Sequence, residues 1–282
     1  MMYKTLKENT LNIVISTYRF LFLRKSLFKL NKLIFTLSLR GMGILNYEND
    51  RLSGEDFFIK KIAKLLHNSV VVDVGANIGN YSNKIKISSP STNIYAFEPH
   101  PNTFKELEVQ ANQNHYVALN AACSDVAGSL QLYDYQNKTY TSHASLYKDV
   151  IDKIHKGVSQ SWHVNVTTID ELVKISKIGH IRLLKIDTEG NELKVLLGAK
   201  ESLAEGLIDI IQLEFNEMNV VSRVFFRDIY ETLNNYLLYR LLPDGLVFLG
   251  EYYSLNLEIF AYQNIVAIRK GFLNEVKYSL NI

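Results

Sequence analysis

Cysteine and proline are scarce in this 282-residue sequence, and so are long apolar runs. The single cysteine, Cys123, excludes an intrachain disulfide and a cysteine-based zinc cluster. Four prolines and 14 glycines argue against long disordered linkers. The formal net charge is only +2, which gives no reason to expect nucleic acid as a partner. With 47% hydrophobic and 21% charged residues, the composition is typical of a globular protein with one substantial core.

The first 45 residues carry most of the positive charge. Eight basic residues and one acid, Glu8, give this segment +7 and leave −5 for the other 237 residues. The basic residues are Lys4, Lys7, Arg19, Arg24, Lys25, Lys29, Lys32 and Arg40. They interrupt the apolar residues, so no stretch is long enough to span a bilayer. No small-residue cleavage site follows an apolar run, unlike in a signal peptide.

We therefore expect a cytoplasmic protein with a basic amphipathic helical extension over residues 1–50, its helices lying within 11–39. Two interpretations of this extension stay open. Its Leu- and Phe-rich faces suit a peripheral helix on an anionic membrane surface, here the inner face of the membrane. The same faces also suit packing on the rest of the protein.

Residues 51–282 alternate between strand and helix patterns, which predicts one α/β domain. Repeated strand–helix units predict a mostly parallel sheet with helices on both faces, and ligand binding at the carboxyl ends of its strands. The expected strands are 70–74, 93–98, 115–121, 129–133, 162–166, 181–187, 207–215, 247–249 and 265–269. The expected helices are 55–66, one containing Ile78, Tyr81 and Ile85, one from Pro101, and 169–175, 191–203 and 225–237.

The most informative segment is the turn after the first strand, from Gly75 through Asn77 to Gly79. Glycines between a strand and a helix let a ligand approach the backbone and the positive end of the helix. Asp73, beside this turn, would repel the pyrophosphate of a dinucleotide but attract the ammonium group of a methionine moiety. The glycine spacing also fits the dinucleotide fingerprint poorly.

Two further positions fit an adenosine. Glu98 ends the second strand, 25 positions after Asp73, where an acid can accept hydrogen bonds from both ribose hydroxyls. Residues 120–125 lie where the third strand should end, beside an adenine. Cys123 falls in this run of small and apolar residues, and we interpret it as a small buried side chain.

The segment from Leu183 to Leu193 predicts the end of the site that binds a second ligand, the acceptor of a transferred group. Alternation along the strand puts Lys185 and Asp187 on one side, with Asp187 at the carboxyl end. Asp187 is the first candidate for a catalytic role, and Glu189, in the following turn, is the second. Either acid could instead cap the next helix. Glu214, Asn216 and Glu217, after the next strand, are candidates for acceptor contacts.

Four segments together resemble the FkbM-type methyltransferase family. They are VDVGANIGNYS (72–82), YAFEPHPNTF (95–104), TTIDEL (167–172) and LLKIDTEGNEL (183–193), over roughly residues 50–270. The resemblance implies a Rossmann-like class I methyltransferase fold for residues 51–282. It also implies an S-adenosylmethionine site around Asp73, Gly75, Asn77, Gly79 and Glu98, and methyl transfer to a hydroxyl of a sugar, glycan or other small molecule. It does not reach residues 1–45.

Other interpretations have less support. A nicotinamide-dependent oxidoreductase disagrees with Asp73 and with the glycine spacing. A catalytically silent, membrane-associated binding module disagrees with an intact cofactor motif. His143, in the polar stretch 128–166, is a candidate base, but a surface histidine is the more frequent case. No group of histidines and carboxylates has metal-ligand spacing, so we expect no metal.

Overall fold

The computed structural model describes residues 2–136, 144–280 and 282, and His143 lies outside them. The chain divides into two units, Met1–Ile44 and Leu45–Ile282. The first unit contains the helices α1 (Met2–Phe22) and α2 (Phe28–Gly41), joined through the short 3-10 helix η1 (Lys25–Leu27). None of the helices in the described residues is long and apolar enough to cross a membrane.

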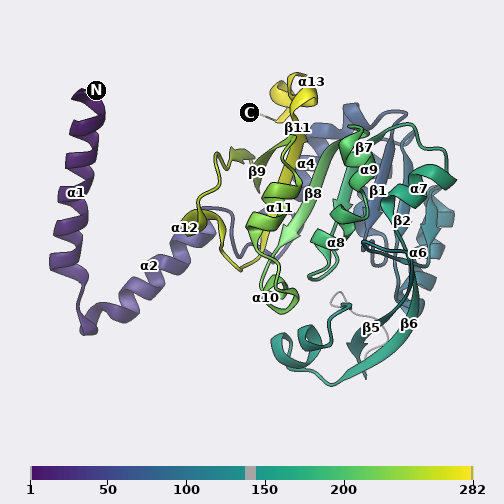
Figure 1. Ribbon diagram of the computed structural model, residues 1–282, viewed down its shortest axis with the longest axis horizontal. Coiled ribbons are helices and arrows are strands. Elements are labelled where there is room, and N and C mark those ends of the chain that lie inside the picture. The colour runs from purple at the N-terminus through teal and green to yellow at the C-terminus, as the bar shows by residue number, and fades with distance from the viewer. Residues whose placement is uncertain (1, 137–143, 281) are drawn as a thin grey trace. The chain divides into compact units, whose positions relative to one another are not determined.

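The second unit is built on an eight-stranded sheet with the order β10-β9-β11-β8-β7-β1-β2-β3 (Figure 1). Its five strands from β3 to β8 are parallel: β3 (Val117–Leu119), β2 (Asn93–Phe97), β1 (Val70–Val74), β7 (Ile181–Ile186) and β8 (Ile208–Phe215). The others pair antiparallel: β11 (Gln263–Arg269), β9 (Tyr236–Leu242) and β10 (Gly245–Phe248). The predicted mostly parallel α/β sheet is confirmed.

Helices cover both faces of this sheet because successive strand residues point to opposite faces (Figure 1). Val72, Val74 and Leu184 lie in one core with residues of α7, α8, α9 and α11. Val71 and Leu183 lie in the other core with residues of α4, α5, α6 and α13. The first group is α7 (Ile169–Ile175), α8 (Glu192–Leu197), α9 (Lys200–Ala204) and α11 (Phe226–Thr232). The second group is α4 (Glu55–Ile62), α5 (Asn80–Ser88), α6 (Pro101–Asn114) and α13 (Leu273–Leu280).

The polar stretch 128–166 and the residues just before it form a second, three-stranded sheet with the order β4-β6-β5. Its strands are β4 (Ala122–Cys123), β5 (Gly128–Tyr135) and β6 (Ser159–Thr167), and β5 pairs with β6 in antiparallel register. Shorter helical elements complete the unit: α3 (Asp50–Ser53), η2 (Ala63–Leu66), η3 (Val150–Ile154), α10 (Met218–Ser222), α12 (Ser254–Leu257) and η4 (Lys270–Phe272).

Two predicted helices differ in the structure. Residues 191–203 contain α8 and most of α9, separated because Asp170 interacts with the chain there. Its backbone N–H bonds to the Gly198 carbonyl oxygen, and its carboxylate accepts from the backbone N–H groups of Glu201 and Ser202, starting a new helix. The expected helix 225–237 ends at Thr232, because Tyr236 and Leu237 already belong to β9, which pairs with β11.

Candidate functional site

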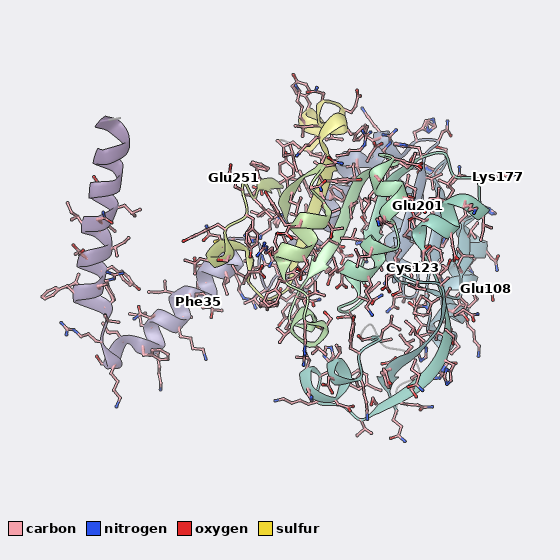
Figure 2. All side chains as sticks on the ribbon, viewed as in Figure 1. Phe35, Glu108, Cys123, Lys177, Glu201 and Glu251 are labelled. Atoms are coloured by element: carbon pink, nitrogen blue, oxygen red, sulfur yellow. The ribbon has the colours of Figure 1, made fainter. Side chains whose placement is uncertain are left out.

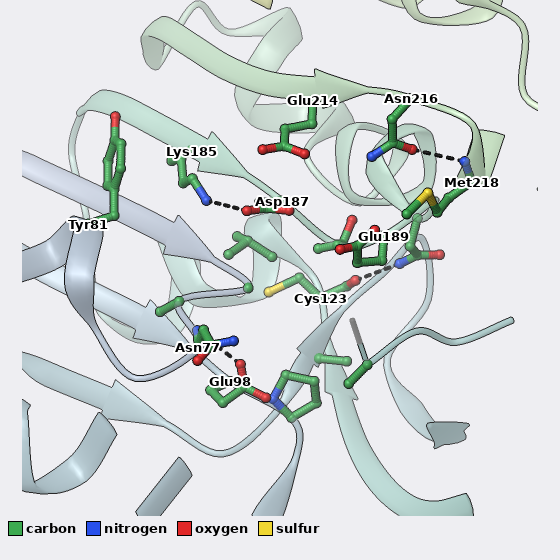
Figure 3. A pocket seen from close by; sticks show the side chains of 18 of the residues that line it. Asn77, Tyr81, Glu98, Cys123, Lys185, Asp187, Glu189, Glu214, Asn216 and Met218 are labelled. Atoms are coloured by element: carbon green, nitrogen blue, oxygen red, sulfur yellow. Dashed lines mark hydrogen bonds and ion pairs between the residues drawn. The ribbon is translucent and has the colours of Figure 1, made fainter. Parts of the chain in front are cut away.

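A cavity of about 750 Å³ opens at the carboxyl ends of β1, β2, β7 and β8. Five of the seven predicted site residues line it: Gly75, Asn77, Glu98, Asp187 and Glu189. The other wall residues used below are Tyr47, Glu55, Tyr81, Ala121, Ala122, Cys123, Lys185, Thr188, Asn191, Glu214, Glu217 and Tyr262. Figure 3 shows side chains from all these strand ends directed toward one space.

The turn after β1 packs directly against the end of β7. Gly75 has φ +80°, and a Cβ atom on it would lie 1.8 Å from the carbonyl oxygen of Asp187. The backbone N–H of Asp187 donates to the Val74 carbonyl oxygen at 3.0 Å. Only glycine fits this close approach, and it keeps the turn open toward the cavity. Gly79 is not in the wall: it precedes α5, and a Cβ there would meet the Tyr116 hydroxyl at 2.4 Å.

Asp73 lies behind the cavity wall rather than in it. It is fully buried, and its Oδ2 accepts a hydrogen bond from the Ser82 hydroxyl at 2.7 Å. Its Oδ1 has no hydrogen-bond partner among the described residues. Burial raises the pKa of Asp73, and the nearby Lys185 ammonium group opposes that rise. Because Asp73 does not line the cavity, its negative charge would affect a ligand only indirectly, through Lys185 and the 75–79 turn.

Glu98 is almost completely buried at the end of β2, with its carboxylate in the cavity wall. One oxygen accepts from the backbone N–H of Asn77 at 3.0 Å (Figure 3), and the other accepts from the backbone N–H of His100 at 2.8 Å. Burial raises the pKa of Glu98 to about 7, although both hydrogen bonds lower it. The carboxylate therefore fixes the 75–79 turn relative to β2 and can also accept hydrogen bonds from a ligand.

Lys185 and Asp187 form the charged centre of the cavity. The Lys185 ammonium group lies 2.9 Å from Oδ2 of Asp187 and 5.3 Å from the centre of the Tyr81 ring (Figure 3). Burial disfavours the charge on Lys185, but Asp187, Asp73 and Glu55 outweigh it and raise its pKa. Asp187 has about a third of its side chain exposed, so it remains accessible to a ligand.

The turn after β7 is held by Glu192, to which the sequence assigns no role. Glu192 is 1% exposed, and Oε1 accepts from the Thr188 backbone N–H, the Thr188 hydroxyl and the Gly190 N–H, at 3.0 to 3.1 Å. Glu189 lines the cavity inside this turn, with φ +52°. An acid in the first turn of a predicted helix is common, so the sequence carried no distinctive signal for Glu192.

The cavity wall at residues 121–123 is small and apolar. Cys123 is 1% exposed, as predicted, and lies inside the domain (Figure 2). Burial raises the pKa of its thiol. Its carbonyl oxygen accepts a hydrogen bond from the Asn191 side chain at 3.0 Å, whereas Oδ1 of Asn191 has no partner in the part of the chain that the structure describes.

One side of the cavity was not predicted, because most of its residues lie outside the four segments that carry the family resemblance. Glu55, from α4, accepts a hydrogen bond from Gln212 on β8 at 2.8 Å. Gln212 accepts in turn from the Tyr81 hydroxyl at 2.6 Å. Tyr47 and Tyr262 complete this side, with ring centres 6.0 Å apart and planes at 78°. Within the described residues, no group of three or more His, Cys, Asp or Glu side chains is arranged to hold a metal ion.

The family model described as "Methyltransferase FkbM domain" matches residues 73–241, from Asp73 in β1 to Leu241 in β9. The chain belongs to this family. The matched range contains every predicted site residue, including Gly75 and Asp187, which form the close contact between the two strand ends. Three residues of the cavity wall lie outside the matched part of this FkbM-family chain: Tyr47, Glu55 and Tyr262.

Several curated proteins are similar to parts of the chain. Methyltransferase sdnD from Sordaria araneosa is 32% identical over 165 residues, 50% of this chain and 64% of that protein. The hexuronic acid methyltransferase AglP from Haloferax volcanii is 30% identical over 138 residues, 48% of this chain and 51% of that protein. The chain thus spans less than two thirds of the length of these two relatives.

A related protein and a solved structure carry the family's name. The 31-O-demethyl-FK506 methyltransferase FkbM from Streptomyces tacrolimicus is 25% identical over 168 residues, 51% of this chain and 65% of that protein. The crystal structure of methyltransferase FkbM from Methylobacillus flagellatus KT aligns with a TM-score of 0.44 and 13% identity. That alignment covers 71% of this chain and 44% of the solved one.

Proposed function

We propose that the chain is an S-adenosylmethionine-dependent methyltransferase that acts on a hydroxyl group of a sugar, a glycan or another small molecule. The observation that carries the proposal is the single cavity that joins the glycine turn and Glu98 to Lys185, Asp187 and Glu214. Membership of the FkbM family supports the reaction class. The relative named for a 31-O position supports an oxygen acceptor, and the relative named for a hexuronic acid supports a sugar.

The residues at β1 and β2 suit the cofactor. Glu98 would accept hydrogen bonds from the ribose hydroxyls, since its carboxylate borders the cavity next to the turn. Residues 121–123 offer a small apolar wall to an adenine, and Asn191, whose Oδ1 has no partner among the described residues, lines the same cavity. The space beside Gly75 and the positive end of α5 suit the methionine carboxylate.

The residues at β7 suit the transfer step. When bound, S-adenosylmethionine supplies an electrophilic methyl group, whose carbon–sulfur bond breaks as the new carbon–oxygen bond forms. The acceptor hydroxyl loses one proton in this step. Lys185 donates to Oδ2 of Asp187, which leaves Oδ1 to orient that hydroxyl or accept its proton. Alignment of the reacting atoms is the larger requirement, because the methyl group is already reactive.

Residues 1–44 would place this activity at a membrane. Among the large apolar side chains of α1 and α2, Leu11, Ile13, Phe20, Leu21, Phe28, Leu33 and Phe35 are exposed (Phe35 in Figure 2). They alternate with the basic residues that give the segment its +7 charge. Apolar faces combined with basic side chains suit an anionic lipid surface. We propose peripheral binding to such a surface.

Titration of the purified protein with S-adenosylmethionine, S-adenosylhomocysteine and NAD tests the proposed reaction class. The proposal predicts binding of the first two and none of NAD. Binding of NAD alone would favour the nicotinamide-dependent oxidoreductase. Binding of none of the three would favour a catalytically silent binding module.

A further inference from the structure

One end of the cavity carries more negative charge than its own residues neutralise. We call this the acid end: Tyr47, Glu55, Lys185, Asp187, Glu214 and Tyr262. It is displaced from the proposed cofactor residues along the sheet, because β8 is separated from β1 by β7. Neighbouring strands are about 4.8 Å apart, so the end of β8 lies roughly 10 Å from the glycine turn.

Three carboxylates surround one ammonium group at the acid end. Glu55, Asp187 and Glu214 all interact electrostatically with Lys185, which is the one Lys or Arg among the described residues that line the cavity. Asp50 also lines the cavity, but Lys84 pairs with it from outside the wall. Lys185 therefore balances one of the three carboxylates and leaves two to be neutralised by protons or by a ligand.

Glu214 is the least satisfied of these acids. No described residue donates a hydrogen bond to it, whereas Glu55 accepts one from Gln212 and Asp187 accepts one from Lys185. Burial and the Asp187 carboxylate raise the pKa of Glu214 well above its usual value, and burial also raises that of Glu55. Figure 3 shows the Glu214 carboxylate directed toward Lys185 and Asp187 across the open space.

The carboxylate oxygens of Glu55, Asp187 and Glu214 make the acid end rich in hydrogen-bond acceptors. Oδ1 of Asn191, in a residue that is 2% exposed, has no partner among the described residues. Three donors are already used: Lys185 to Asp187, the Thr188 hydroxyl to Glu192, and the Tyr81 hydroxyl to Gln212. A ligand with N–H and O–H groups of its own would satisfy these acceptors, which are costly when buried without donors.

The aromatic side chains at the acid end also suit a positive charge. Tyr47 and Tyr262 present rings at 78° to each other, next to Glu214 and Glu55. Aromatic faces attract ammonium groups, and carboxylates strengthen that attraction. Carboxylates and rings would disfavour a uronate or phosphate in the same place, because Lys185 is already paired with Asp187.

We infer that the acceptor carries a protonated amine near the hydroxyl that is methylated, as in an amino sugar, and that Glu214 binds this amine. The inference rests on the proposed methyl transfer and specifies its acceptor. Bound S-adenosylmethionine would add one net positive charge near β1, and Asp187, at the end of β7 between β1 and β8, would lie between the two cations. The acceptor class differs from the hexuronic acid in the name of the Haloferax volcanii relative.

The test compares three matched monosaccharides: glucosamine, glucose and glucuronic acid. Their binding to the full chain, saturated with S-adenosylhomocysteine, is measured by calorimetry at a pH below the pKa of the glucosamine amine. We expect glucosamine to bind roughly 10- to 100-fold more tightly than glucose, the usual effect of a hydrogen bond between charged groups, and glucuronic acid to bind weakest. Glu214→Gln should remove most of the preference for the amine. The control Glu108→Gln, an exposed acid on α6 outside the cavity wall, should keep it.

Cofactor binding separates the two levels of the proposal. If S-adenosylhomocysteine does not bind the unmodified chain, the proposed function fails. If it binds, three outcomes contradict the inference that the acceptor carries a protonated amine. They are equal affinity for glucosamine and glucose, tighter binding of glucuronic acid, and no binding of any sugar. An amine preference that Glu214→Gln leaves unchanged contradicts the role of Glu214. Loss of cofactor affinity in Glu214→Gln, with the sugar preference intact, assigns Glu214 to the cofactor instead.

Discussion

The carbonyl oxygen of Asp187 lies 1.8 Å from the position that a Cβ atom on Gly75 would occupy. The two strand ends can approach this closely because the turn after β1 has no side chain at that position. The contact brings Asn77 and Glu98 next to Lys185 and Asp187 in one cavity. The proposed cofactor and acceptor ends of the site thus meet where the backbone after β1 packs against the backbone after β7.

Gly75→Ala should therefore damage both stability and ligand binding. The methyl group would collide with backbone, and the positive φ would be strained, at a cost of at least about 2 kcal/mol. We expect a lower melting temperature and at least tenfold weaker S-adenosylhomocysteine binding. Gly245→Ala is the matched control, since nothing lies within 4 Å of a Cβ there and its φ is not positive. Equal behaviour of both variants would argue against the contact.

Glu98 should make stability fall as the pH rises from about 4.5 to about 7. Its pKa is raised to about 7 in the folded chain by burial, so the folded state holds a proton that the unfolded state has released in this range. The penalty is absent below this range and complete above it, on the order of 2–3 kcal/mol. Glu98→Gln should flatten this part of a curve of melting temperature against pH. An unchanged slope would show that Glu98 is not the responsible group.

The basic segment should bind anionic vesicles through charge and apolar side chains together. In flotation at low salt, the full chain should rise with vesicles that contain phosphatidylserine and stay behind with pure phosphatidylcholine. Each basic residue near the surface contributes about 1 kcal/mol, so Arg24→Glu with Lys25→Glu should weaken binding strongly. Lys60→Glu with Lys61→Glu, on α4 in the second unit, is the control. Absence of flotation would favour packing of these helices on the protein.

Asp187→Asn should slow methyl transfer more than it weakens cofactor binding. A base that removes the hydroxyl proton contributes roughly 100- to 10,000-fold, and an orienting carboxylate less. Turnover is measured with labelled S-adenosylmethionine and an acceptor found in the sugar comparison, while cofactor affinity is measured separately. Glu189→Gln, in the same turn, tests the second candidate. Full turnover in Asp187→Asn would remove Asp187 from the transfer step.

Much of the sheet was predictable because its signals are local. Apolar runs ended by glycine or an acid marked β1, β2 and β7, and each brought a predicted residue to the cavity. Tyr236–Leu242 was missed because β9 depends on antiparallel pairing with β11. The acid end was predicted in part: Lys185, Asp187 and Glu214 were candidates, whereas Glu55, Tyr47 and Tyr262 were missed because they come from distant parts of the chain. Its Tyr81–Gln212–Glu55 hydrogen bonds join residues 131 and 157 positions apart, which no local pattern encodes.

Asp73 shows the limit of position along a strand. The sequence places this acid beside the glycine turn, and the structure confirms that neighbourhood. Asp73 pairs in register with Lys185 and shares its face of the sheet, but its shorter side chain bonds to Ser82 of α5 and does not line the cavity. Which of the acids in such a turn contacts a ligand depends on helix packing that a sequence pattern does not contain.

Calorimetric titration of S-adenosylhomocysteine into the unmodified chain, Glu98→Ala and Glu108→Ala tests the central claim most directly. Glu108 is an exposed acid on α6 that does not line the cavity, and it serves as the control (Figure 2). The account predicts binding to the unmodified chain, unchanged affinity in Glu108→Ala, and roughly 10- to 100-fold weaker binding in Glu98→Ala. Failure of the unmodified chain to bind, or equal affinity in all three proteins, would contradict it.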